Sequence, residues 1–536
     1  MKSSKVALIL IVCLGFLLRF INIGNNPPAL YGDELTIVYD SYSLLHTGQD
    51  QTGQSFPLTF SMGAGRPGGY VYGSIPFVAM FGPTALGVRA LSILSGIGMI
   101  ILLFYIGRKL FSEKIGLVVS LVTAISPWEI SLSRGGFEAH FALFLVLLGA
   151  YSFLRAKDKP LLYLVSAISF GLTLHTYPTY KITLPLFLIL LFWFVGFKNV
   201  LARGRNYLVF GVAIFIILAG LSLSQTFTNG SESRFFSINV FTTDAPKIEE
   251  KINLERSISN LPSPFTKIFH NKPIEYVKTV GENYLQNFSP DFLFIHGDRN
   301  PRHNMATVGG LYFVEVVFII VGLLSFWKTQ RKLMVFLVLW VLLAPIPTAF
   351  IDTPHALRSS LMLPPLILLS SLGLATLLDK KNKIVLRLLG VIFVIQLIFF
   401  LQKLYFLSPN EYNRFWAYPA KIASESAIKN QNNFDFIFLS DRIDNIEFAY
   451  PVYSKTHPGV VISQNIQRTN LEGRNFKKIN NVYIGYVPNE MDKSFIEKLN
   501  GTVLYITAPS EEKYTEGYDT IIGKEGLPQI IFFKKQ

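Results

Sequence analysis

The chain has a single cysteine and few charged residues. Lys, Arg, Asp and Glu make up 16% of its 536 residues, whereas soluble domains carry about a quarter. The one cysteine, Cys13, excludes an internal disulfide and a metal site built from cysteines. Half of the residues are hydrophobic, and apolar runs of about 20 residues, long enough to cross a bilayer as helices, recur through most of the sequence. The composition therefore predicts a polytopic helical membrane protein.

About eleven hydrophobic segments are candidate membrane spans. The first follows Lys2 and Lys5 like a signal peptide, but no small-residue cleavage site interrupts Val6 to Ile23, so we expect it to be retained. The predicted spans are residues 5–23, 86–107, 115–128, 138–154, 160–176, 180–197, 207–226, 308–327, 333–350, 357–378 and 384–404.

The connections between these spans alternate in charge. One set carries 18 basic and three acidic residues, an excess that accounts for the net charge of +14. The positive-inside rule places this set in the cytoplasm, together with the N-terminus. The basic balance therefore reports topology, and we expect no nucleic-acid partner. The connections expected to face outward are residues 24–85, 129–137, 177–179, 227–307 and 351–356.

The composition becomes polar after Leu404. Short apolar runs there predict strands, and one stretch between them predicts a helix: Phe434–Leu439, Val482–Val487, Thr502–Thr507 and Gln529–Phe533 for the strands, and Asp492–Leu499 for the helix. The predicted fold class is mainly α. A polytopic transmembrane helical bundle occupies residues 1–405, and a small C-terminal α/β extracytoplasmic domain occupies residues 406–536.

An acidic pair, Asp33 and Glu34, directly follows the first span. Neighbouring carboxylates point to different faces of a helix or strand, so one could act as a general base while the other holds structure or a cation. The alternative is that both stabilise a helix N-terminus through its dipole. The same connection contains Arg66 in a stretch rich in Gly, Pro and Tyr, which predicts short helices lying on the membrane.

Three further ionisable residues stand at the outward ends of spans. Arg134 is a candidate for a phosphate or a carboxylate, because a guanidinium forks onto either. Glu138 opens the next span and is either a site residue or a helix-dipole acid. Lys181, close to Tyr177, begins a helix against the usual dipole preference, which indicates either an anion partner or simple snorkelling.

Two later segments add histidines and arginines. His296, Asp298 and Arg302 cluster with His303 just before a span and fit a lid or phosphate clamp, or else a solvated loop. His355 and Arg358 are three residues apart, so they share a face if helical. Together they could hold a phosphate or diphosphate headgroup.

These motifs together resemble the GT-C membrane glycosyltransferases, in particular the protein mannosyltransferase family (glycosyltransferase family 39) and the aminoarabinose transferases of lipid A. Gly32-Asp33-Glu34 matches the acidic pair of these families. Ser126-Pro127-Trp128 with Ser133-Arg134 and Glu138, and His355 with Arg358, are similar to patterns of bacterial members that depend on a phospholipid carrier. The resemblance covers residues 1–405 and leaves the C-terminal domain without a counterpart.

The resemblance implies transfer of a sugar, with inversion, from a polyprenyl-phosphate donor to an acceptor hydroxyl at the outer face of a bacterial plasma membrane. The acceptor is a protein, lipid or glycan. Asp33 would be the base, and Glu34 would support it or hold a cation. Residues implied to neutralise the departing phosphate are Arg134, Lys181, Arg302, His355 and Arg358. Further candidates are Arg66, Glu138, Tyr177, His296 and Asp298. The aminoarabinose enzymes also suggest a divalent metal ion held by a first-loop acid and a distant His, with no residues assigned in this chain.

Two other activities compete with this prediction. An O-antigen ligase or polymerase also has a long outer loop with arginines, but its chemistry does not depend on an early acidic pair. A lipid-linked sugar transporter or flippase would place polar residues near the middle of the bilayer, whereas the charges here lie at the outward ends of spans. A C-terminal active domain on a membrane anchor is a third reading, but eleven spans exceed what an anchor needs.

Overall fold

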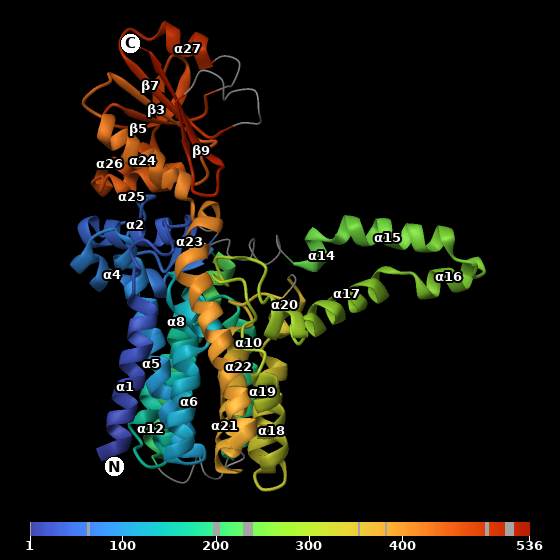
Figure 1. The fold of residues 1–536 in the computed structure, drawn as a ribbon. Helices are drawn as coiled ribbons and strands as arrows, with labels where there is room; N and C mark the ends of the chain where they lie inside the picture. Colours follow the sequence, from blue (N-terminus) through green and yellow to red (C-terminus); the bar gives the residue numbers. More distant parts are fainter. Residues whose placement is uncertain are drawn as a thin grey trace.

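The computed structural model describes residues 2–61, 65–196, 204–228, 239–351, 354–380, 383–487, 492–509 and 519–535. Parts of the predicted connections, including residues 197–203, 229–238 and 352–353, lie outside this set. A bundle of long helices carries the N-terminus at one end, and a small sheet domain with the C-terminus stands beyond the other end (Figure 1).

Each predicted span contains a helix. The bundle helices are α1 (Lys2–Phe20), α5 (Ala85–Leu110), α6 (Glu113–Ile125), α8 (Glu138–Ala156), α9 (Leu162–Leu174), α10 (Tyr180–Val195), α12 (Arg205–Thr228), α18 (Glu315–Trp327), α19 (Arg331–Leu343), α21 (Leu363–Lys380) and α22 (Lys383–Gln402). Within the described residues, seven helices are long and apolar enough to cross a membrane. The helices α9, α10 and α18 are apolar but shorter.

The third predicted span is broken. Helix α6 is followed by α7 (Pro127–Ser133), and the two are bent by 59°. Ser126 between them has extended backbone angles, because a residue before proline is disfavoured in the α region. The break turns α7 across the end of the bundle and brings Arg134 and Glu138 close to the first connection.

The eighth predicted span begins later than expected, at Glu315. Gly309 and Gly310, which precede it, are packed closely: a Cβ on Gly309 would lie 2.2 Å from the main chain of Phe294. A Cβ on Gly310 would lie 2.8 Å from the ring of Trp128. This segment therefore crosses the end of the bundle as an irregular chain before α18 begins.

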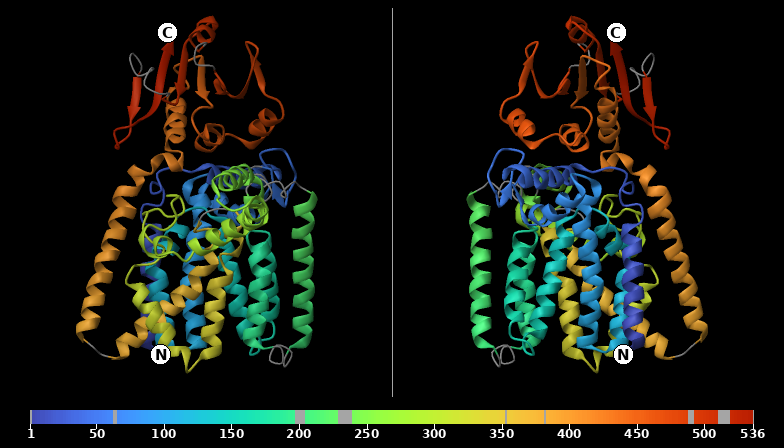
Figure 2. Two further views of the ribbon diagram at one scale, coloured as in Figure 1. Left: turned by 90° about the vertical axis from the view of Figure 1, so that its right-hand side faces the viewer. Right: turned by 90° about the vertical axis from the view of Figure 1, so that its left-hand side faces the viewer.

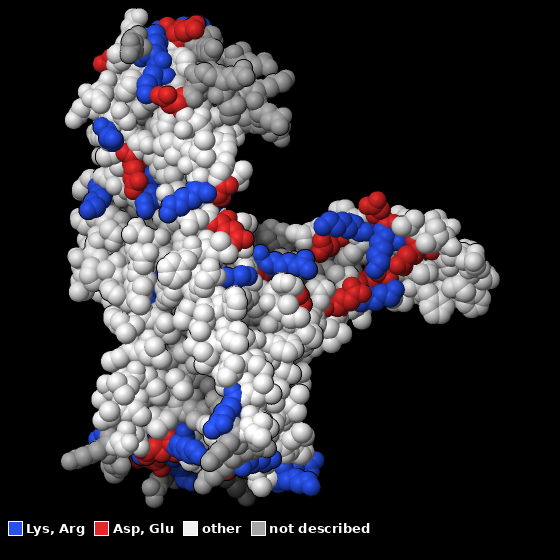
Figure 3. All heavy atoms as spheres, viewed as in Figure 1, with Lys and Arg blue, Asp and Glu red and all other residues white. Residues whose placement is uncertain are grey.

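Charged residues gather at the end of the bundle that carries the N-terminus (Figure 3). The turns between α5 and α6, α8 and α9, and α18 and α19 lie there, and the helix ends beside them contain Arg108, Lys109, Arg155 and Lys332. We call this the basic end and the opposite end the domain end. The charge asymmetry on which the topology prediction depends is thus an asymmetry of the folded molecule.

Short elements cover the domain end. They are α2 (Gly32–Thr47), α4 (Gly69–Phe81) and a small hairpin of β1 (Thr59–Phe60) with β2 (Arg66–Pro67). Both helices lie between the bundle and the sheet domain (Figure 1). The expectation of short helices in the first outward connection is confirmed.

A helical arm projects sideways at the same level (Figure 1). It consists of α14 (Val240–Thr243), α15 (Ala245–Ile258), α16 (Ser263–Phe269) and α17 (Lys272–Gln286). The chain then returns through η1 (Asp291–Ile295) to an irregular loop before α18, and α20 (Ile346–Ala349) and η2 (Ser360–Met362) connect α19 to α21.

The C-terminal region after α22 contains a seven-stranded sheet in the order β4-β5-β6-β3-β7-β9-β8. Its strands are β3 (Phe436–Ser440), β4 (Thr469–Leu471), β5 (Arg474–Ile479), β6 (Val482–Gly485), β7 (Val503–Thr507), β8 (Asp519–Ile522) and β9 (Pro528–Lys535). Its helices are η3 (Lys403–Leu407), α23 (Ser408–Glu411), η4 (Asn413–Trp416), α24 (Tyr418–Asn430), α25 (Ile446–Tyr453), α26 (Pro458–Ile466) and α27 (Asp492–Lys498). The central β3 pairs in parallel with β6 and β7. The four predicted strands and the predicted helix are all present.

The sheet domain rests on α2 (Figure 2). One hydrophobic core joins Leu35 and Val38 of α2 with Ile446 and Ala449 of α25. At the start of α2 the fit is tight, because a Cβ on Gly32 would lie 2.5 Å from the side-chain oxygen of Asn445. The position of the acidic pair is therefore determined from above by the sheet domain and from below by the bundle.

Candidate active site

Glu34 lies inside the protein. Its side chain is fully buried, and both of its oxygens pair with Arg89 of α5 at 2.8 Å. It also accepts the main-chain N–H of Gly136 at 2.8 Å. Arg89 in turn donates to the carbonyls of Ile23, Pro27 and Ala29. Glu34 thus ties the first connection, α5 and the segment before α8 into one buried network.

Asp33, one residue earlier, faces outward. Its side chain is 45% exposed and pairs with Arg66, a buried residue whose guanidinium also lies 2.6 Å from Glu138. Arg66 donates to the Thr36 hydroxyl at 2.7 Å as well. Burial disfavours the charge on Arg66, but Glu138 and Asp33 outweigh it and raise the pKa of Arg66. Asp33 is therefore an oriented carboxylate with a free side.

An aromatic cluster surrounds Tyr31, two residues before Asp33. The ring of Tyr31 lies 5.8 Å from that of Phe137 and 5.4 Å from that of Trp416. Arg302 stands over the same Tyr31 ring, 5.4 Å from its centroid. Burial and then the charge of Asp33 raise the pKa of Tyr31 well above its ordinary value, so the phenol stays neutral. Arg302 is thus held beside the residue that leads into Asp33.

Asp298, His303 and His355 form a compact group on the other side of this cluster. Nδ1 of His303 donates to Oδ2 of Asp298 at 3.1 Å, and Nδ1 of His355 lies 3.8 Å from the same oxygen. The centroids of the two imidazole rings lie 4.4 Å apart with the rings tilted by 32°, and the His303 ring also contacts Phe137 at 5.8 Å.

The charges of this group influence one another. Burial favours the neutral form of Asp298, but the hydrogen bond from His303 and the charge of that histidine lower its pKa to about 2. Burial and the positive charges of His303, Arg358 and Arg302 place the pKa of His355 well below its ordinary value. His355 is therefore neutral at physiological pH, and Arg302 and Arg358 carry the positive charge.

Arg358 is partly exposed. Among the residues that the structure describes, its side chain makes no hydrogen bond or ion pair. It follows His355 in a turn in which the Ser359 N–H donates to the His355 carbonyl. The turn places His355 and Arg358 close together, as the spacing predicted for a helix.

Four other predicted residues lie elsewhere. Arg134 is fully buried and donates to the main-chain carbonyls of Leu18, Arg19, Ile21 and Asn26. Its guanidinium also stacks on Tyr405. No part of it faces solvent, so it joins α1 to the end of α7.

Lys181 of α10 donates to the Ser222 carbonyl of α12, and Tyr177 packs against Tyr180. His296 is 71% exposed and pairs with Asp291. It therefore points away from the Asp298 group, although the two residues are close in sequence.

The sequence analysis did not identify Arg89 or a second buried network around Arg19. Arg19 pairs with Glu129, and Glu129 lies 3.1 Å from His140. Both arginines lie within predicted apolar spans, where an isolated charge is costly and so implies a partner. That signal was available, but it does not reveal which carboxylate is the partner.

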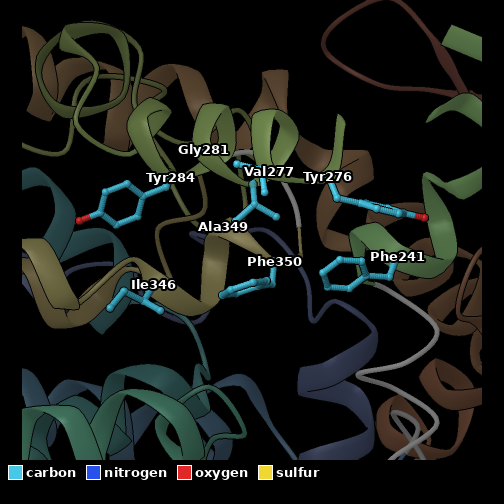
Figure 4. Close-up of a pocket in the computed structure, with 9 residues that line it drawn as sticks. Phe241, Tyr276, Val277, Gly281, Tyr284, Ile346, Ala349 and Phe350 are labelled. Carbon is cyan, nitrogen blue, oxygen red and sulfur yellow. The ribbon is translucent and has the colours of Figure 1, made fainter. Parts of the chain in front are cut away.

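An apolar cavity of about 440 Å³ opens between the arm and α20. Phe241, Val277, Ala349 and Phe350 are among the residues that line it (Figure 4). Asn287, which caps α17 beside the cavity, accepts a hydrogen bond from Ser359 at 2.7 Å. The cavity thus adjoins the turn that carries His355 and Arg358.

Comparisons with known proteins agree with the predicted family likeness. Residues 75–222 match the family model described as dolichyl-phosphate-mannose-protein mannosyltransferase. The crystal structure of ArnT from Cupriavidus metallidurans in the apo state superimposes with a TM-score of 0.55 at 12% identity. That match covers 99% of this chain and 98% of ArnT. The chain resembles the GT-C membrane glycosyltransferases.

A second structure of ArnT, bound to undecaprenyl phosphate, matches this GT-C-like chain with a TM-score of 0.54 at 11% identity, over 98% of this chain and 97% of ArnT. The archaeal oligosaccharyltransferase AglB from Archaeoglobus fulgidus matches with a TM-score of 0.49 at 14% identity, over 84% of this chain and 63% of AglB. No curated protein matches the sequence. The ArnT likeness establishes the fold, and the predicted fold class of a multi-pass helical membrane protein with a small sheet domain is confirmed.

Proposed function

We propose that the protein is an inverting membrane glycosyltransferase that moves a sugar from a polyprenyl-phosphate donor to an acceptor hydroxyl. The observation that carries the proposal is the proximity of both Asp33 and Arg302 to Tyr31: Arg302 lies 5.4 Å from the ring centroid, and burial and then the charge of Asp33 raise the pKa of the phenol. We therefore expect one bound substrate to reach a half-exposed carboxylate and a cation together near this ring. The family model matched by residues 75–222, and the ArnT structure that holds undecaprenyl phosphate, support a lipid-phosphate donor.

In the proposed reaction, Asp33 accepts the proton of the acceptor hydroxyl as that oxygen attacks the anomeric carbon. The bond from the anomeric carbon to the phosphate oxygen breaks, and the phosphate keeps the electron pair. Arg302 and Arg358 then face a growing negative charge, which is the main electrostatic task of the site. Attack opposite to the leaving group inverts the anomeric configuration.

Positioning residues complete this assignment. Arg66 orients Asp33 through their ion pair, and Glu138 shares that arginine. Glu34 supports the base indirectly, because its pair with Arg89 determines where the first turn of α2 lies. The apolar cavity beside Ser359 is the proposed place for the isoprenoid tail near the phosphate.

A metal held by a first-loop acid and a distant histidine, as the family likeness implies, does not fit these residues. Glu34 is sealed against Arg89, Asp33 pairs with Arg66, and no histidine is among the partners of either carboxylate in the described part of the chain. The proposed reaction therefore contains no step that depends on such an ion.

The basic end is proposed to face the cytoplasm and the domain end the outside of a bacterial plasma membrane. The sugar and the acceptor, whether protein, lipid or glycan, are identified by the assay. Purified protein in lipid nanodiscs is incubated with radiolabelled polyprenyl-phosphate sugars and candidate acceptors, and the labelled product is isolated.

Asp33→Asn should lower transfer by about 10²–10⁴, and Asp441→Asn, at an exposed carboxylate of the sheet domain, should preserve it. Full activity of Asp33→Asn would reject the assigned base and favour a ligase or polymerase chemistry. Movement of labelled donor across sealed vesicles without any transfer would favour a flippase.

A further inference from the structure

We propose that Asp298, His303 and His355 form a binding site for one divalent transition-metal ion, with Zn²⁺ as the best fit. Asp298 and His303 belong to the loop before α18, whereas His355 comes from the turn before α21. The fold brings these distant segments together at the domain end. This inference does not rest on the proposed function, since metal binding needs neither donor nor acceptor.

The spacing of the three side chains suits a single ion. One ligand atom from each residue lies within 4.8 Å of the others. Nδ1 of His303 and Nδ1 of His355 lie 3.1 and 3.8 Å from Oδ2 of Asp298. Ligands at about 2.0–2.1 Å from a tetrahedral zinc stand roughly 3.3 Å apart. The separations, at most 4.8 Å, would therefore have to close by no more than about 1.5 Å to bring all three atoms into contact with one ion.

The donor set also selects the type of metal. Two imidazoles and one carboxylate suit zinc and its transition-metal neighbours, whereas calcium and magnesium prefer oxygen ligands alone. Nδ1 of His355 accepts the Leu357 N–H at 3.3 Å, so this nitrogen is unprotonated, as a metal ligand must be, and the ion would replace this long hydrogen bond. A bound ion would take the place of the hydrogen that now lies between Nδ1 of His303 and the Asp298 carboxylate.

The surroundings hold these ligands in place. The side chains of Asp298, His303 and His355 are only 6%, 10% and 19% exposed. Asp298 accepts main-chain N–H groups from Asn300 at 2.8 Å and Ala356 at 2.7 Å, which fixes its carboxylate. Such outer partners orient metal ligands in known sites. Three protein ligands leave a fourth position open, as in zinc sites that bind a further ligand.

A hydrogen-bonded His–Asp–His packing group without metal is the competing explanation. The metal site and the metal-free packing group differ in the number of Zn²⁺ ions bound per chain, which can be measured. The full chain, freed of any histidine tag and treated with chelator, is titrated with ZnCl₂ in detergent by calorimetry, and Co²⁺ is used as a spectroscopic probe. We expect one Zn²⁺ per chain and a visible Co²⁺ absorption of a tetrahedral site.

His303→Ala and His355→Ala should weaken Zn²⁺ binding at least ~100-fold, more than the 10–100-fold typical of outer partners. His296→Ala is the matched control, because this exposed histidine of the same loop faces Asp291 and should leave binding unchanged. Saturating Zn²⁺ should also raise the Tm of the wild-type chain and of His296→Ala but not of His355→Ala, even if that variant is less stable. Absence of Zn²⁺ binding at micromolar concentration, or equal loss in His296→Ala, would overturn the proposal.

Discussion

Asp33 and Glu34 are neighbours in sequence and opposites in environment. Asp33 is 45% exposed beside Arg66, whereas Glu34 is sealed against Arg89. Successive residues of a helix point in directions about 100° apart, so the first turn of α2 sends one carboxylate to the surface and the other into the bundle. The two members of an acidic pair can therefore have different roles. Asp33 is proposed to act in the reaction, and Glu34 stabilises the structure that positions Asp33.

The same division applies to the cations. Arg89 and Arg134 are fully buried, and their guanidinium groups are occupied by carboxylates or main-chain carbonyls. Arg302 and Arg358 are partly exposed and lie near the site. Residues of the first kind should affect stability when changed, and residues of the second kind should affect the reaction.

The largest effect on stability is expected at the buried ion pair of Glu34 and Arg89. Arg89→Ala leaves Glu34 buried without its partner, and breaking such a pair costs about 3–5 kcal/mol. We expect poor recovery of folded protein and a strongly lowered unfolding temperature, measured by dye-based thermal denaturation in detergent. Lys109→Ala is the control, since its exposed pair with Asp158 is screened by water and should contribute little to stability. Equal stability of the two variants would contradict the comparison.

Asp33→Asn should affect the reaction and leave stability unchanged. The turnover should fall by about 10²–10⁴, the usual contribution of a general base, because an amide cannot accept the acceptor proton. The thermal midpoint should stay close to that of wild type, since Arg66 keeps Glu138 as a partner. A stability loss as large as that of Arg89→Ala would instead assign Asp33 a structural role.

Arg358→Ala and Arg134→Lys separate the two kinds of cation at smaller magnitude. Removing an open cation should cost about 1.5–3 kcal/mol of phosphate interaction, which raises the donor KM or lowers kcat without changing the thermal midpoint. Arg134→Lys should lower the midpoint and leave the donor KM unchanged, because the residue bonds only carbonyls and stacks on Tyr405. The reverse pattern would return Arg134 to the phosphate site.

The smallest effect is expected for His296→Ala. This side chain is 71% exposed and pairs only with Asp291 among the described residues. Initial rates should stay within about twofold of wild type, as surface changes away from a site usually cost less than about 0.5 kcal/mol. A tenfold loss would show that the loop before α18 uses a residue that the structure points away.

The elements predicted best are those that bury a regular apolar pattern. All eleven spans contain helices, and the four strands of the sheet core lie where short apolar runs predicted them. The strands β4, β5 and β8 were missed because they lie toward the edges of the sheet and are rich in polar residues such as Thr469, Lys477 and Asp519. A helix end shaped by a close glycine contact, as at Glu315, also leaves little trace in hydrophobicity.

The candidate site was predicted in pieces. The position of ionisable residues at the outward ends of predicted spans indicated Asp33, Arg302, His355 and Arg358. The fold brings these residues to one end of the bundle. The partners of buried charges could not be predicted, since Arg89 meets Glu34 across 55 positions of sequence. The proximity of His355 to Asp298 likewise depends on tertiary folding, and neither segment alone carries a signal for it.

The sheet domain that rests on α2 has a consequence for traffic around Asp33. A large substrate that approached along the bilayer normal would meet the sheet domain first, because Asn445 and α25 cover the beginning of α2. We therefore expect substrates to reach Asp33 laterally, along the plane of the lipid headgroups. Slender chains and lipid-borne molecules suit such an entrance, and a rigid globular acceptor would have to offer a loose loop or tail.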